Sequence, residues 1–258
     1  MVLIDLRMAG WFSFLREKRC RLKISIILPT YNESGNIIKL ISSVLANIPK
    51  GYEVEVINVD DDSPDQTHHL VKDAYVDDPR VVPLLRTEDK GLAKSIHHGI
   101  NNSSGEFIVV MDTDFSHNPD EIPVMIHIAK VFDVVSGSRF CEGGDMDSRR
   151  HYIASLLFNW WVRLILRTQI QDNLSGYFLI KREKLCKLPL AEIFQGYGEY
   201  YFRLLHYAQK AGLSIIEIPV VYKTRSSGFS KSNFYKMIFT YSMALYKIRY
   251  AAFRESRK

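Results

Sequence analysis

Residues 24–29 read ISIILP, an apolar run that ends at Pro29, and this pattern predicts a buried strand. Apolar side chains then recur at helical spacing from Ile37 to Ile48, so we expect a helix over 34–48 that packs on the strand. The alternation continues, with strands expected at 53–59, 81–85, 106–111 and 132–136 and helices at 68–75, 91–101 and about 120–130. It predicts an α/β fold with a mostly parallel central sheet and helices on both faces.

Polar clusters follow three of the expected strands. They are residues 29–33 (PTYNE), 60–63 (DDDS) and 112–114 (DTD). Ligands of parallel sheets bind outside the carboxyl ends of the strands, so we expect these clusters to meet at one edge of the sheet. A folded core alone does not require acidic clusters there, and the pattern therefore indicates a binding site.

Beyond residue 145 the pattern changes to strongly apolar helices. Helices are expected over 152–166, 196–212 and 234–253, and a strand over 214–222. No segment reaches the run of roughly 18 uncharged apolar residues that a spanning helix needs. Asp5 and Arg7 interrupt the apolar start of the chain, which argues against a signal peptide. We therefore expect a cytoplasmic protein that lies on a membrane, with no spanning helix.

The composition indicates a folded protein with an uneven distribution of charge. The chain has 258 residues, of which 47% are hydrophobic, and this excludes disorder of the whole. Cys20, Cys141 and Cys186 are scattered, which argues against a structural zinc site or a disulfide framework. Residues 1–23 and 223–258 are basic within a net charge of +5, so the middle is acidic. Basic ends of this kind predict contact with an anionic surface.

The triplet Asp112-Thr113-Asp114 is the central chemical signal. Two carboxylates one residue apart, just after the apolar stretch FIVVM, can present oxygens to one hard cation such as Mg²⁺ or Mn²⁺. Such a cation would bridge the protein to a diphosphate. A D-x-D triplet alone is more often a polar turn, but the acidic residues 60–62 after another strand favour the metal site. The phosphate-binding motifs GxGxxG and GxxxxGK[ST] are absent, which argues against a dinucleotide oxidoreductase or a P-loop enzyme.

A series of collinear motifs spans residues 24–231. They are ILPTYNE (27–33), VDDDSPDQT (59–67), KGLAKSIHHGI (90–100), VMDTDFSHNPDEIP (110–123), SGSRF (136–140), DNLSGYF (172–178) and RSSGFSK (225–231). Together they resemble the motifs of inverting glycosyltransferases of family 2 with the GT-A fold. Within that family the resemblance is to the dolichyl-phosphate mannose synthases, a group of polyprenyl-phosphate sugar synthases.

The resemblance implies a function. It implies transfer of a sugar from a nucleotide-sugar donor, GDP-mannose above all, to dolichyl or polyprenyl phosphate at a membrane surface, with Mg²⁺ or Mn²⁺ as cofactor. A separate membrane subunit is a possible partner. The chain would then comprise a basic amphipathic segment (1–23), a GT-A catalytic domain (24–232) and a basic amphipathic helix at the membrane interface (233–258).

The resemblance also implies roles for individual residues. Nucleotide-sugar contacts are expected from Pro29, Tyr31, Glu33, Asp60, Asp61, Lys90 and Gly91, with Asp61 facing the base. A catalytic set is expected from Asp112, Asp114, Arg139, Arg225 and Lys231, and metal ligands from Asp112, Asp114 and Ser116. Arg and Lys suit phosphate oxygens, and Gly228 leaves room for a mobile loop.

The acceptor side departs from the family pattern. Contacts to the acceptor phosphate are expected from Arg150, His151 and Ser155, where relatives usually carry a basic residue four positions before a serine. In addition, SGYF at 175–178 replaces the commoner SGFR, and Ser116 stands where relatives often have Gln. Acceptor contacts are therefore expected to differ in detail.

Three apolar segments are candidates for the membrane contact. The first holds Trp11, Phe12, Phe14 and Leu15; the second Leu156, Leu157, Trp160, Trp161 and Leu164; the third Met237, Ile238, Tyr241, Leu245, Ile248 and Phe253. Basic residues accompany the first and the third. The second segment fits a buried core helix equally well.

Alternative functions remain open. A transferase of the same fold could use a UDP-sugar and a hydroxyl of a lipid-linked or polysaccharide acceptor, and it would need a general base, for which Glu199 is the candidate. An ordinary glutamate at a helix start is the preferred interpretation of Glu199. A basic protein that binds without catalysis is a different class. Nucleic acid is not expected as a partner because the basic residues lie at the chain ends. Among the histidines, only His117 is a candidate for supporting the metal ligands.

Overall fold

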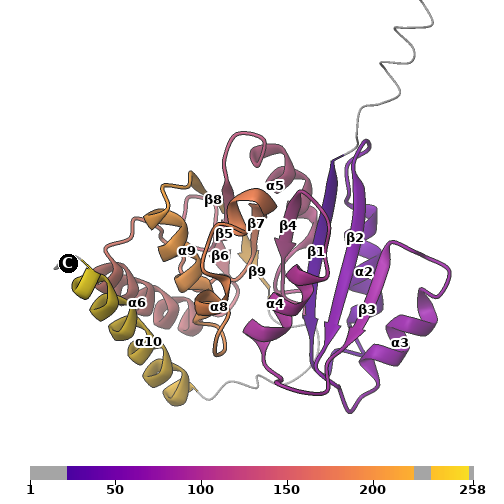
Figure 1. Cartoon of the computed structure of the whole chain (residues 1–258), viewed down its shortest axis with the longest axis horizontal. Coiled ribbons are helices and arrows are strands. Elements are labelled where there is room, and N and C mark those ends of the chain that lie inside the picture. The colour runs from indigo at the N-terminus through magenta and orange to yellow at the C-terminus, as the bar shows by residue number, and fades with distance from the viewer. Residues whose placement is uncertain (1–21, 224–233, 256–258) are drawn as a thin grey trace, which may run out of the picture.

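The computed structural model describes residues 22–223 and 234–255, which form a central sheet covered by helices on both faces (Figure 1). The sheet has seven strands in the order β3-β2-β1-β4-β7-β5-β8. Their bounds are β1 Lys23–Thr30, β2 Glu53–Asp60, β3 Val81–Leu85, β4 Phe107–Val110, β5 Val134–Ser138, β7 Phe178–Lys181 and β8 Ile215–Pro219. The short strands β6 (Asp145–Met146) and β9 (Val221–Tyr222) pair separately.

Strand β7 is the strand of the central sheet that the sequence pattern missed. It lies between β4 and β5 and runs antiparallel to both. The other pairings of this sheet are parallel, as expected: β1 with β2 and β4, β2 with β3, and β5 with β8. The run FLIK is short and carries no periodicity of its own, so only its neighbours define it as a strand.

The helices alternate with the strands in the first half of the chain and cluster in the second half. Their bounds are α2 Ile37–Ala46, α3 Thr67–Ala74, α4 Leu92–Asn101, α5 Ile122–Ile128, α6 Arg149–Leu166, α7 Arg182–Leu185, α8 Leu190–Ile193, α9 Tyr200–Lys210 and α10 Phe234–Glu255. A 3₁₀ turn, η1 (Pro119–Glu121), precedes α5, and Asn118 caps it by accepting a hydrogen bond from the Asp120 backbone N–H.

Two apolar layers sandwich the sheet because successive side chains of a strand point to opposite faces. On one face Ile24, Ile26 and Leu28 of β1 pack with α2, α3 and α5. On the other face Ile27 of β1 packs with α4 and with α7 to α9. Burial on both faces explains why the strand reads as a continuous apolar run.

Helices α6 and α10 lie side by side at one end of the molecule (Figure 1). They bury a third cluster that includes Val162 and Leu166 of α6, Phe202 of α9 and Leu245 of α10. The membrane-facing role expected for Tyr241, Leu245 and Ile248 is wrong, because these side chains face inward, whereas Phe239, Met243, Tyr246 and Tyr250 are exposed. The side chains of Met237, Ile238 and Phe253 lie outside the described part of the chain. On α6, Leu156, Leu157, Trp160 and Leu164 are exposed, whereas Trp161 packs against the cluster.

None of the described helices is long and apolar enough to cross a bilayer. The predicted N-terminal segment, 1–23, lies almost wholly outside the described residues, as does the boundary at 232. The helix predicted after that boundary is α10, and its inner face belongs to the same core as α6 and α9.

Candidate functional site

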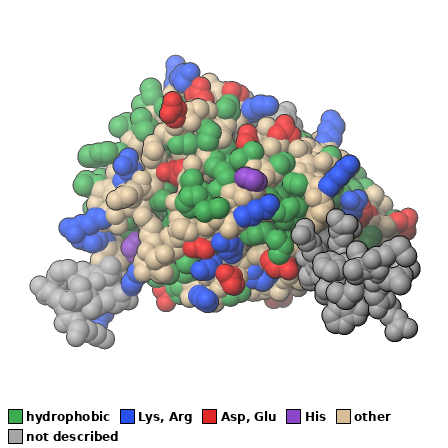
Figure 2. Space-filling model, turned by 90° about the horizontal axis from the view of Figure 1, so that it is seen from above, with side chains coloured by type: hydrophobic (Ala, Val, Ile, Leu, Met, Phe, Trp, Pro, Cys, Tyr) green, Lys and Arg blue, Asp and Glu red, His purple; other side chains and the backbone are tan. Residues whose placement is uncertain are grey.

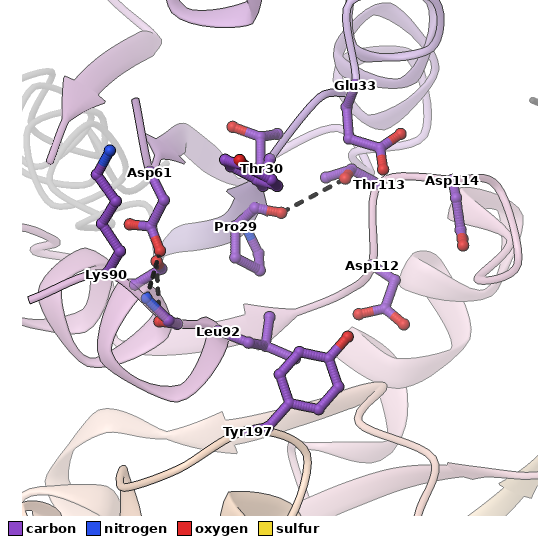
Figure 3. A pocket seen from close by; sticks show the side chains of 13 residues that line it. Pro29, Thr30, Glu33, Asp61, Lys90, Leu92, Asp112, Thr113, Asp114 and Tyr197 are labelled. Carbon is purple, nitrogen blue, oxygen red and sulfur yellow. Dashed lines mark hydrogen bonds between the residues drawn. The ribbon is translucent and has the colours of Figure 1, made fainter. Parts of the chain in front are cut away.

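A pocket of about 500 Å³ opens at the carboxyl ends of β1, β2 and β4, where the sequence predicted that the polar clusters meet (Figure 3). Its lining comprises Pro29, Thr30, Tyr31, Glu33, Asp61, Lys90, Gly91, Leu92, Ser95, Asp112, Thr113, Asp114 and Tyr197. The volume suits a small-molecule ligand or cofactor. Because β1 pairs with β2 on one side and with β4 on the other, residues 29–33 lie between the two acidic clusters.

Asp61 lies at one end of the pocket and is held by two donors. Its Oδ1 accepts a hydrogen bond from Arg86 Nη1 at 2.6 Å, and its Oδ2 accepts one from the Gly91 backbone N–H at 2.6 Å. Arg86 is itself anchored by Ser95 Oγ at 2.7 Å and by the Asp89 carbonyl at 2.6 Å. Both partners of this ion pair are nearly buried, so the carboxylate has a fixed orientation. The sequence analysis missed Arg86, although a basic residue directly after a strand was a usable signal.

Asp60 does not line the pocket, in contrast to its predicted grouping with the nucleotide-sugar contacts. Its side chain is fully buried and accepts hydrogen bonds from Thr30 Oγ1 and from the N–H and Oγ of Ser63. It therefore stabilises the turn that presents Asp61. Lys90 lies at the rim, where its Nζ contacts Asp62 at 2.8 Å, and both side chains are exposed.

Asp112 and Asp114 lie at the opposite end of the pocket, on a tight turn after β4. Phe115 adopts a left-handed conformation, with φ of 63°, and the Ser116 N–H donates to Asp114 Oδ1 at 3.0 Å. The Asp114 residue is only 4% exposed, whereas the Asp112 side chain is 44% exposed. Ser116, the third predicted metal ligand, is not among the pocket-lining residues. It contacts Asp114 through the hydrogen bond from its backbone N–H.

The donor set at this end fits a hard divalent cation. Figure 3 shows Glu33, Asp112 and Asp114 around the same end of the pocket, and all three offer carboxylate oxygens. Within residues 22–223 and 234–255, no group of three or more His, Cys, Asp or Glu side chains is close enough to hold a metal by itself. A cation bound here would therefore complete its shell with water or ligand oxygens, which is the usual arrangement for Mg²⁺.

His117 supports the turn that carries Asp112 and Asp114 from the protein interior. Its Nδ1 accepts a hydrogen bond from the Asp112 N–H at 2.8 Å, and its Nε2 lies 2.6 Å from Tyr222 Oη. The ring is fully buried and stacks on Tyr177, with centroids 4.8 Å apart. Burial lowers the pKa of His117, and the accepting Nδ1 requires a neutral ring with its proton on Nε2. His117 thus links the turn to β9.

Arg139 lies outside the pocket lining, and its guanidinium is engaged with another carboxylate. Its Nε and Nη2 donate to Asp172 at 2.7 and 2.8 Å, and the guanidinium lies over the Tyr222 ring. Both charged side chains are buried. Burial by itself lowers the pKa of Arg139, but the Asp172 carboxylate outweighs this and raises it. The geometry is that of an internal anchor, in contrast to the expected position beside phosphates. Asp172 lies in the quoted motif 172–178, but no role was assigned to it.

The remaining predicted residues lie away from the pocket lining or outside the described part of the chain. Arg150, His151 and Ser155 occupy the first turns of α6, and none of them lines the pocket. His151 Nδ1 contacts Ser148 Oγ at 2.9 Å. Arg225 and Lys231 fall within residues 224–233, which the structure does not describe.

Glu199, the candidate general base, is 2% exposed and does not line the pocket. Its Oε2 accepts a hydrogen bond from the Tyr197 N–H at 2.9 Å, and Arg203 lies 3.7 Å from its Oε1. Tyr197, which the sequence analysis did not single out, does line the pocket. No local sequence signal identifies it, since only the path of the loop before α9 brings it there.

Residues 25–188 match the model of the family described as "Glycosyl transferase family 2". The match covers more than half of the chain, and the chain therefore belongs to glycosyl transferase family 2. This confirms the family that the motifs indicated.

Relatives with assigned names point in the same direction. The chain is 31% identical to a dolichol-phosphate mannosyltransferase of Pyrococcus furiosus over 88% of its own length and 64% of that protein, so it spans less than two thirds of this relative. It is also 31% identical to a polyprenol monophosphomannose synthase of Mycolicibacterium smegmatis, over 80% of this chain and 79% of the relative.

Solved structures confirm the predicted GT-A fold. Glucosyl-3-phosphoglycerate synthase from Mycobacterium tuberculosis, in complex with Mn²⁺, UDP-glucose and phosphoglyceric acid, superposes with a TM-score of 0.67 at 21% identity. The superposition covers 92% of this chain and 83% of that one. The same enzyme in complex with Mg²⁺ and UDP gives a TM-score of 0.65 at 21% identity, over 90% of this chain and 81% of the other.

Proposed function

We propose that this chain is an inverting, divalent-metal-dependent glycosyltransferase that moves a hexose, mannose from GDP-mannose first of all, onto a polyprenyl phosphate at a membrane surface. The observation that carries the proposal is one pocket with Asp61 at one end and Asp112 and Asp114 at the other. The names of the relatives from Pyrococcus furiosus and Mycolicibacterium smegmatis support mannose as the sugar and polyprenyl phosphate as the acceptor.

The two ends of the pocket suit the two ends of a nucleotide diphosphate. Asp61 accepts hydrogen bonds, and a carboxylate that already has two donors still has acceptor positions for the N–H groups of a base. Asp112 and Asp114 would hold Mg²⁺ or Mn²⁺ beside the diphosphate, with Glu33 at the same end of the pocket (Figure 3). The cofactor would offset the charge that develops on the leaving nucleoside diphosphate. A fold relative crystallised with Mg²⁺ and UDP, and with Mn²⁺ and UDP-glucose, supports the use of a divalent metal with a nucleotide sugar.

A phosphate acceptor would need no general base in the pocket. The second pKa of a phosphate monoester is about 6, so its oxygen is already a nucleophile near neutral pH. It would attack the anomeric carbon directly as the bond to the nucleoside diphosphate breaks. The alternative hydroxyl acceptor requires a base, and Glu199 is instead directed to the Tyr197 N–H and Arg203. This geometry favours the phosphate.

The apolar outer face of α6 and α10 supports the membrane surface. Here Leu157 and Trp160 are 63% and 61% exposed, and Phe239 and Tyr250 are 68% and 64% exposed. Arg163, Lys247 and Arg249 are exposed on the same two helices. Exposed aromatic and aliphatic residues with basic neighbours suit the headgroup region of an anionic bilayer. A separate membrane subunit stays a predicted partner. Arg225 and Lys231 are proposed to contact the phosphates.

Binding of nucleic acid has less support. Figure 2 shows one face of the molecule, on which Lys and Arg side chains are interspersed with Asp and Glu. Nucleic-acid-binding proteins instead gather basic residues in a patch or stripe. A gel-shift assay over a range of salt concentrations tests this alternative directly.

The experiment that tests the proposal is a matrix of donors and acceptors. The whole chain is incubated with GDP-mannose, UDP-glucose or UDP-N-acetylglucosamine, with Mg²⁺ or Mn²⁺, and with polyprenyl phosphate in liposomes. We expect a lipid-soluble mannosyl product that requires both the metal and the carrier. A product formed only on polyprenol or sugar hydroxyls supports the hydroxyl-acceptor alternative, and metal-dependent donor binding without any turnover supports a binding protein.

A further inference from the structure

The loop between α8 and α9 forms one wall of the pocket. It holds Tyr197, a residue that is 46% exposed and lines the pocket. Figure 3 shows the Tyr197 hydroxyl directed toward Asp112. The loop also approaches the Asp61 end, because the Gly196 carbonyl oxygen lies within van der Waals distance of the Cβ position of Gly91. The backbone of the loop therefore reaches toward the Asp61 end, whereas the Tyr197 hydroxyl faces the Asp112 end (Figure 3).

Glu199 and Arg203 hold this loop from inside the protein. Glu199 Oε2 accepts the Tyr197 N–H at 2.9 Å, and Arg203 Nη1 donates to the Gln195 carbonyl at 2.6 Å. The Glu199 carboxylate fills the space where a Cβ at residue 196 would lie, and Gly196 has φ of 76°. Only glycine combines this left-handed backbone with such a close carboxylate. The buried Glu199 therefore determines the path of the backbone on which Tyr197 sits.

Helix α10 supports the loop from the other side. The Tyr241 hydroxyl occupies the space beside Gly198 where a Cβ would otherwise point. Tyr241 is 6% exposed, and its ring packs edge-on against Phe158 of α6 and Phe202 of α9. The loop is therefore held by contacts from α9 on one side and α10 on the other.

We propose that Tyr197 contacts the hexosyl group of the donor and contributes to its selection, and that Glu199 and Tyr241 act as positioning residues for Tyr197. The inference rests on the proposed function. In a nucleotide sugar the hexose follows the diphosphate, so a diphosphate at Asp112 and Asp114 brings the hexose to the side of the pocket that the Tyr197 hydroxyl faces. An aromatic ring offers an apolar face for the C–H groups of a sugar and a hydroxyl for one of its oxygens.

The test compares the binding of GDP with that of GDP-mannose, measured by calorimetry with Mn²⁺ present. For Tyr197→Ala we expect the dissociation constant of GDP-mannose to rise about tenfold, the scale of one lost aromatic contact, with that of GDP almost unchanged. Tyr31→Ala is the matched control, because Tyr31 is also exposed in the pocket, at 43%, and is assigned to the nucleotide. It should weaken both ligands equally. An equal loss for Tyr197→Ala overturns the sugar contact.

Glu199 is tested by two substitutions. Glu199→Gln keeps an oxygen that accepts the Tyr197 N–H, so turnover and its pH profile should change little. Glu199→Ala should reproduce the selective loss of GDP-mannose binding seen for Tyr197→Ala. If Glu199→Gln instead abolishes transfer, removes the acidic limb of the pH profile and leaves GDP-mannose binding intact, then Glu199 is a general base and the positioning role is overturned. Failure of the unaltered protein to bind or use GDP-mannose refutes the proposed function itself, which separates the two outcomes.

Discussion

Arg86 Nη1 lies 2.6 Å from Asp61 Oδ1, and both side chains are nearly buried beside the pocket. A buried carboxylate beside a ligand is costly unless a cation and hydrogen bonds compensate it. Arg86 provides that compensation and fixes the orientation of Asp61, while Ser95 and the Asp89 carbonyl orient Arg86. The end of the pocket proposed for the base is thus preorganised before any ligand binds.

The Asp61–Arg86 pair predicts a stability effect. Arg86→Met should lower the free energy of unfolding by about 3–5 kcal/mol, because it leaves the Asp61 carboxylate buried without its partner. Asp61→Asn combined with Arg86→Met should recover part of the loss, since no uncompensated charge remains. Urea unfolding of the two variants checks this. A double variant no more stable than Arg86→Met contradicts it.

Asp114→Asn should reduce transfer by orders of magnitude and leave the thermal midpoint near that of the unaltered protein. One charged oxygen ligand is lost from the turn, and the carboxamide binds a hard cation more weakly. Binding of Mn²⁺ in the presence of GDP, followed by paramagnetic relaxation, gives a readout that does not depend on turnover. Asp120→Asn is the control, because Asp120 is exposed on η1 nearby. Unchanged Mn²⁺ binding by Asp114→Asn removes Asp114 from the metal site.

Arg139 is either an internal anchor that pairs with Asp172 or a catalytic group that contacts phosphate, and the two roles predict different effects of substitution. If the pair is an anchor, Arg139→Met and Asp172→Asn should each destabilise the protein by about 3–5 kcal/mol, because each leaves a buried charge alone. Thermal and urea unfolding, measured together with the transfer rate, distinguish the two roles. Normal stability of Arg139→Met with lost transfer supports the phosphate contact that the family resemblance implies.

The exposed face of α6 should bind anionic membranes. Leu157→Glu combined with Trp160→Glu should abolish flotation with anionic liposomes, because the two acidic side chains oppose both apolar insertion and the surface charge. Val131→Glu is the matched control: Val131 is 76% exposed but lies after α5. Flotation of the double variant equal to that of Val131→Glu rules out this face. Binding to neutral liposomes measures the apolar part alone.

Glu55 should make the protein sensitive to acid. Burial alone would raise the pKa of Glu55, but hydrogen bonds from Lys23, Ser25 and Ser104 outweigh it and lower the pKa from 4.5 to about 2. Because the pKa of Glu55 is lower in the folded state than in the unfolded state, the ionised carboxylate stabilises the folded state at pH values above about 4.5. This stabilisation is lost as the pH falls from about 4.5 toward 2.

Glu55→Gln should therefore lower stability near neutral pH, by at most about 3 kcal/mol, and flatten the loss of stability in acid. Glu53→Gln, at an exposed position of the same strand, is the control. Urea titrations at several acidic pH values measure both effects. Parallel pH profiles for Glu55→Gln and the unaltered protein contradict the role of this network.

Much of the fold and more than half of the pocket lining followed from local patterns. The strand–helix alternation of residues 24–136 and the strand expected at 214–222 predicted the parallel part of the sheet, because period 2 and period 3.6 are properties of consecutive residues. The polar clusters after the first, second and fourth strands all reached the pocket, since carboxyl ends of neighbouring parallel strands lie together. The predicted contact between Asp60 and the ligand is wrong, because the Asp60 side chain is buried and accepts hydrogen bonds within the turn that presents Asp61. Sequence spacing does not show this burial.

The sequence by itself determined the α/β class, the family and the position of the acidic clusters, because those depend on neighbouring residues and on motifs. Only the tertiary structure decided the pairings across long separations. Arg139 meets Asp172 33 residues away, and His117 meets Tyr222 105 residues away. The antiparallel insertion of β7, the inward face of α10 and the entry of Tyr197 into the pocket depend in the same way on what each segment packs against. Burial and ion pairing are properties of the assembled surroundings of a side chain, and no period of the sequence encodes them.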